Sequence, residues 1–130
     1  MNDNSKGMRA ALRAAEQRRD FFAWLQADAD RLVSAAELLG GEPWKRRALA
    51  VAKAIAGGQA PEAVEEELID LHQLLTLNFT DDIESLEAAC FALVHPDDPG
   101  ADDARLCAEA LESGLDAMRA FGVLAVKKVA

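Results

Sequence analysis

Apolar residues recur every three or four positions along most of this 130-residue chain, and this spacing constrains its fold more than any other feature. Such a repeat places the apolar side chains on one face of an α-helix. Glycine pairs and prolines divide the repeats into segments, because glycine commonly ends a helix and proline commonly begins one. Apolar and polar residues nowhere alternate as a half-buried strand requires. The pattern therefore predicts an all-α protein.

Five helical segments follow from these boundaries. The first ends at Gly40 and Gly41, and it is so long that we expect it to break near residues 18–20. The fourth begins at Asp81, which has Glu84 three residues later as in a capping box, and it ends before Pro96. The predicted helices cover approximately residues 8–39, 43–56, 61–79 and 81–95, and a last helix runs from about 102 to 121 or beyond.

The length suits one domain, which we place at residues 8–130, after a polar tail at residues 1–7 that we expect to be disordered. The segment 61–79 is expected to be the central helix of the bundle. Its apolar residues occupy most of the helix circumference, so neighbours should contact it from several sides. They are Val64, Leu68, Ile69, Leu71, Leu74, Leu75, Leu77 and Phe79.

An aromatic patch on the first helix is wider than one helical neighbour can cover. Phe21, Phe22, Trp24 and Leu25 span an arc of about 160° at 100° per residue. Either two elements pack there, or part of the patch is exposed and meets a partner. Aromatic residues anchor both cores and interfaces, so both readings stay open, and self-association is one of the outcomes we expect.

Charge divides the chain unevenly. Residues 1–60 carry ten Lys and Arg against seven Asp and Glu, whereas residues 61–130 carry four against sixteen, and the net charge is −9. Lys45, Arg46 and Arg47 form the most concentrated basic site and are candidate partner-binding residues. A nucleic-acid surface normally dominates the net charge, so we do not expect nucleic acid as a partner. We expect these cations to pair with the acidic half, within the fold or across a dimer.

Metal ligands and catalytic motifs give weak signals. His72, Cys90, His95 and Cys107 lack the short spacing of compact zinc sites, and both cysteines fall on apolar stripes, which predicts buried free thiols. Glu67 is the one acidic residue near His72 that faces the apolar arc of its helix. No nucleophile or phosphate-binding motif accompanies them. The sequence predicts neither a resident metal nor a cofactor.

The sequence lacks a signal peptide and any apolar stretch long enough to span a membrane, and its cysteines suit a reducing compartment, so we expect a cytoplasmic protein. The preferred hypothesis is a non-enzymatic protein-binding, regulatory or adaptor protein. It would act through the aromatic patch and the acidic half, and could bind itself. The alternatives are a metal-dependent helical enzyme or metal-binding protein using His72 and nearby carboxylates, and a structural subunit of a larger assembly.

Overall fold

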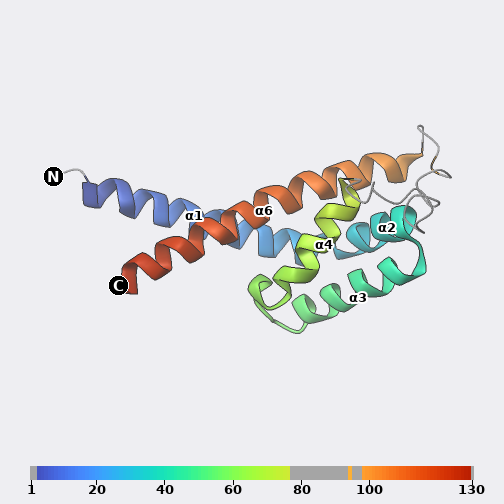
Figure 1. The fold of residues 1–130 in the computed structure, drawn as a ribbon, viewed down its shortest axis with the longest axis horizontal. Helices are drawn as coiled ribbons and strands as arrows, with labels where there is room; N and C mark the ends of the chain where they lie inside the picture. The colour runs from blue at the N-terminus through green and yellow to red at the C-terminus, as the bar shows by residue number, and fades with distance from the viewer. Residues whose placement is uncertain (1–2, 77–93, 95–97, 130) are drawn as a thin grey trace.

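The computed structural model describes residues 3–76, 94 and 98–129, and nearly all of them are helical (Figure 1). No strand occurs among these residues, so the all-α prediction is confirmed. The helices are α1 (Asp3–Ala27), α2 (Ala29–Gly40), α3 (Glu42–Ala56), the short 3₁₀-helix η1 (Pro61–Val64), α4 (Glu65–Leu75) and α6 (Pro99–Val129). None of these helices combines the length and apolarity that a membrane crossing requires.

The first predicted helix is two helices, and the break predicted near residues 18–20 was wrong in position. α1 continues through Arg18 and ends at Ala27, and α2 begins at Ala29. Asp28 separates them. Aspartate has a low helix propensity, because its short polar side chain can hydrogen-bond to nearby backbone groups in non-helical conformations. The Asp28 amide still donates to the Trp24 carbonyl at 2.8 Å, so the hydrogen bonds of α1 continue up to the break. α1 begins at Asp3, and disorder of the predicted tail in solution stays a prediction.

The other described boundaries lie close to those expected. α3 begins one residue before Pro43 and ends before Gly57, and the chain then turns at Gly58, whose φ of 91° favours glycine. Pro61 begins a 3₁₀ turn that leads directly into α4. α6 begins at Pro99, earlier than expected, and continues past Phe121 to Val129. The predicted fourth helix, with Leu77 and Phe79 before it, lies outside the described residues.

The helices form one bundle in which α1 and α6 lie side by side and cross (Figure 1). The N-terminal part of α1 and the C-terminal part of α6 extend beyond α3 and α4 at one end of the molecule. α4 contacts α2, α3 and α6, as expected of a central helix, and α2 and α6 have similarly many neighbours. Ile69 differs from the expectation because it is exposed. The largest fully buried aliphatic side chains are Leu25, Leu32, Val51, Ile55, Leu68, Leu71, Leu74 and Leu111.

A glycine allows the close approach of α1 to α6. The buried ring of Phe21 lies over Gly114, and a Cβ added there would come closer than 3.0 Å to three ring atoms. Any larger residue would push the ring, and α1 with it, away from α6. Gly114 is therefore required by packing, whereas Gly122, further along the same helix, has no atom within 4 Å of an added Cβ.

These two glycines give a matched test of the packing. We expect Gly114→Ala to destabilise the protein by about 1–3 kcal/mol, because overpacking exceeds the gain in helix propensity. Gly122→Ala should be neutral or stabilise by roughly 0.5–1 kcal/mol, because it gains propensity without a clash. Urea unfolding followed by circular dichroism measures both. Equal effects of the two substitutions would show that Phe21 does not pack on Gly114.

Candidate functional site

The aromatic patch predicted on the first helix is divided between core and surface. Phe21 and Leu25 are 4% and 2% exposed and belong to the core, whereas Phe22 and Trp24 are half-buried and pack against it. The ring of Phe21 stacks on that of Trp24, with centroids 6.1 Å apart and an interplanar angle of 12°. Trp24 is thus held by a buried ring while part of its own surface stays accessible to a partner.

Trp24 lines an open groove of about 600 Å³ between α1 and α6. The α1 side carries residues three or four positions apart, which lie on one stripe of the helix. The α6 side follows the same spacing with mostly small side chains. The lining residues are Gln17, Asp20, Phe21 and Trp24 from α1, and Ala110, Ser113, Gly114, Asp116, Ala117 and Ala120 from α6.

Residue size and charge give this groove its character. The small α6 side chains leave space beside the larger ring of Trp24. Asp20 and Asp116 lie along it, and both are exposed. Neither carboxylate makes an ion pair with any residue that the structure describes. The groove therefore combines an apolar surface with two available negative charges.

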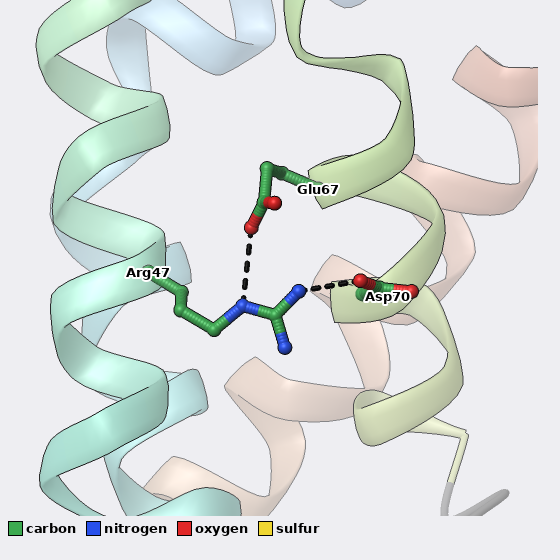
Figure 2. Close-up of polar contacts among 3 residues, drawn as sticks. All are labelled: Arg47, Glu67 and Asp70. Atoms are coloured by element: carbon green, nitrogen blue, oxygen red, sulfur yellow. Dashed lines mark hydrogen bonds and ion pairs between the residues drawn. The ribbon is translucent and has the colours of Figure 1, made fainter.

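The predicted basic site on α3 is occupied by partners within the chain. Nε of Arg47 donates to Oε2 of Glu67 at 3.1 Å, and its Nη2 donates to Oδ2 of Asp70 (Figure 2). The guanidinium also lies 4.2 Å from the ring centroid of Trp44. Arg47 therefore joins α3 to α4, which agrees with the expected pairing of the basic cluster with the acidic half.

The two basic residues before Arg47 pair with carboxylates that are closer to them in the sequence. Nζ of Lys45 lies 3.2 Å from Oε2 of Glu37, and Nε of Arg46 lies 3.6 Å from Oε1 of Glu42 in the preceding turn. Glu37 and Glu42 both belong to residues 1–60, so the expected pairing with the acidic half was wrong for Lys45 and Arg46 and is confirmed for Arg47 alone among the three. Their role in binding a partner stays a prediction.

A second arginine, Arg18, joins three elements, two of which are the helices that form the groove. Arg18 of α1 donates from Nε and Nη2 to both carboxylate oxygens of Glu62 in η1, at 2.5 and 2.6 Å. Its guanidinium lies 5.0 Å from the ring centroid of Phe121 in α6. Bidentate pairs of this kind fix geometry as well as adding energy. The hydrogen bonds from Arg18 lower the pKa of the Glu62 carboxyl.

The candidate metal ligands are not brought together among the described residues, where no group of three or more His, Cys, Asp and Glu could hold an ion. Glu67 is bound by Arg47, and Cys107 is a buried free thiol whose pKa burial raises to about 11. Nε2 of His72 is buried and has no hydrogen-bond partner there. Cys90 and His95 lie outside the described residues, so the buried thiol predicted at Cys90 stays a prediction.

Comparison with protein-family models, curated proteins and solved structures finds no match for this chain.

Most of the groove was not predicted from the sequence. The predicted patch contains Phe21 and Trp24 but neither Gln17 nor Asp20, which share their stripe. On α6 the sequence pattern assigns the face with Leu111 to the core, and the groove lies on the adjacent stripe of small residues. That stripe, with alanine, serine or glycine at positions 110, 113, 114, 117 and 120, was the available signal.

The Arg18–Glu62 pair predicts a pH-dependent stability. Because the folded state lowers the pKa of Glu62, the pair stabilises the protein above the ordinary glutamate pKa of 4.5, and this contribution is lost as acid protonates the carboxylate. Glu62→Gln should therefore lower the urea midpoint at pH 7, and its difference from the unmodified protein should shrink toward zero below a pH of about 4.

Glu65→Gln provides the control, since Glu65 is exposed and makes no ion pair with a described residue. It should change the midpoint little at either pH. A Glu62→Gln difference that persisted unchanged into acid would contradict the role assigned to the ion pair.

Proposed function

We propose that this chain is a protein-binding protein of the adaptor or regulatory kind, and that it holds a basic amphipathic helix of a partner in the groove between α1 and α6. The observation that carries the proposal is the composition of the groove: an accessible tryptophan and small apolar side chains beside Asp20 and Asp116. A helix lying in an apolar groove is a common mode of peptide recognition.

Each component of the groove suits one part of such a partner. The apolar surface of Trp24 and Ala120 would accept aliphatic side chains, and tryptophan is among the residues that most often contribute strongly to binding. Asp20 and Asp116 would accept hydrogen bonds from lysine or arginine. The face of Trp24 is a further site for a cation, since cations bind favourably over an indole ring.

The charge of the whole chain supports a basic partner over an acidic one. A net charge of −9 attracts cationic ligands over a distance and raises their association rate. Most of the arginines on the bundle already pair with carboxylates, including Arg18, Arg31 and Arg47. An acidic partner would be repelled by Asp20 and Asp116, the two carboxylates that line the groove. The cytoplasmic location expected from the sequence stays a prediction.

A synthetic peptide tests this function. The probe is a helical peptide with leucine and lysine at i, i+4 spacing, and its comparison peptide carries glutamate in place of lysine. We expect the basic peptide to bind at least about tenfold more tightly than the acidic one, as measured by fluorescence anisotropy of the labelled peptide.

Two serine substitutions make this test specific to the groove. Ser113→Arg places a large cation on the α6 side and should weaken binding of the basic peptide about tenfold or more. Ser34→Arg adds the same charge at an exposed position of α2 and should have little effect. Binding that ignores peptide charge, or that both substitutions reduce equally, would overturn the proposal.

A further inference from the structure

The N-terminal part of α1 carries the kind of charge that the groove lacks. Arg9 and Arg13 are exposed, and neither makes an ion pair within the part of the chain that the structure describes. This part of α1 extends away from the rest of the bundle (Figure 1). The helix thus presents available cations on the same element that carries Asp20.

These cations lie along the same side of α1 as the groove. Arg13, Gln17, Asp20 and Trp24 follow one another at intervals of four, three and four residues, which places them on one stripe of the helix. Arg9 is four residues before Arg13 and lies beside the same stripe. One face of α1 therefore changes along its length from positive at Arg9 and Arg13 to negative at Glu16 and Asp20.

A face of this kind is complementary to itself when it is reversed. In a two-fold symmetric contact, if residue i of one copy meets residue j of the other, then residue j of the first copy also meets residue i of the second. Each pair of residues therefore occurs twice. Two α1 helices that meet antiparallel near residues 16–17 would place Arg13 of each copy opposite Asp20 of the other, within one turn of Gln17. The same arrangement would bring Arg9 toward Trp24 of the other copy, where a cation over the indole is favourable.

We infer that the basic helix held by the groove is α1 of a second copy of this chain. This inference rests on the proposed function and names its partner. The two copies form an antiparallel, two-fold dimer in which the Arg9–Arg13 part of one α1 lies along the α1–α6 groove of the other. The contact contains two equivalent Arg13–Asp20 pairs, so it weakens at high salt.

A charge exchange in the full-length chain tests the dimer. Sedimentation equilibrium over roughly micromolar to millimolar concentrations should show a monomer–dimer equilibrium for the unmodified protein. Arg13→Glu and Asp20→Lys should each weaken dimerisation about tenfold or more, since each places like charges together twice. The double variant, Arg13→Glu with Asp20→Lys, restores both pairs with reversed sign and should recover most of the lost affinity.

Arg19→Glu is the matched control. Arg19 is exposed, has no ion pair with a described residue and lies on another side of α1, so its reversal should leave dimerisation unchanged. Arg13, Arg19 and Asp20 are all exposed, and thermal unfolding at a concentration where the variants are monomeric should give closely similar midpoints. Loss of dimer through unfolding is thereby distinguished from loss of the contact.

Three results would overturn the inference: a monomer throughout the concentration range, an effect of Arg19→Glu equal to that of Arg13→Glu, or a double variant as weak as the single ones. Binding of the basic peptide by a chain that stays monomeric would overturn the second copy as partner and leave the proposed function standing. A chain that neither dimerises nor binds the peptide would overturn both.

Discussion

The contact between the Phe21 ring and the backbone of Gly114 sets the distance between α1 and α6, and the groove depends on that distance. Gly114 has no Cβ, so the buried ring can lie directly on α6. Phe21 in turn supports Trp24 by stacking, which leaves one surface of the indole facing the groove. Arg18 reinforces the same pair of helices, because it binds Glu62 and lies over Phe121 of α6. A site built on two rigid helices can hold its shape without a ligand.

Ion pairs explain which charges are left for a partner. Arg18 joins α1 to η1, Arg31 joins α2 to α6, and Arg47 joins α3 to α4. Each pair is partly exposed and adds modest stability on its own, so their main effect is to orient the helices. They also neutralise much of the basic half of the chain. The charges without such partners among the described residues include Arg9 and Arg13 in the N-terminal part of α1, and Asp20 and Asp116 along the groove. The two carboxylates in the groove are the reason for proposing a basic helix as the bound element.

Periodicity predicted the fold well, because helix formation and burial depend on local spacing that a single sequence displays. The stripe through Leu68, Leu71 and Leu75 is buried as expected, and so is Cys107 on α6. The position of the α1–α2 break was wrong because it depends on one residue, Asp28, in a stretch with good helix formers on both sides. The groove was mostly missed because it is a property of two helices together. Nothing in the sequence relates Asp20 to Ser113. They line the same groove only because Phe21 packs on Gly114 and brings α1 and α6 side by side.

The two tryptophans of the chain allow the most direct measurement of the central claim, that the α1–α6 groove binds a basic helix. Trp24 lines the groove, whereas Trp44 lies on α3 beneath the guanidinium of Arg47. In a ¹H–¹⁵N NMR spectrum each indole N–H gives its own signal. Titration with the basic helical peptide is expected to shift the Trp24 signal progressively and to leave that of Trp44 in place. A shift of Trp44 alone, or no shift of either signal at saturating peptide, would contradict the account.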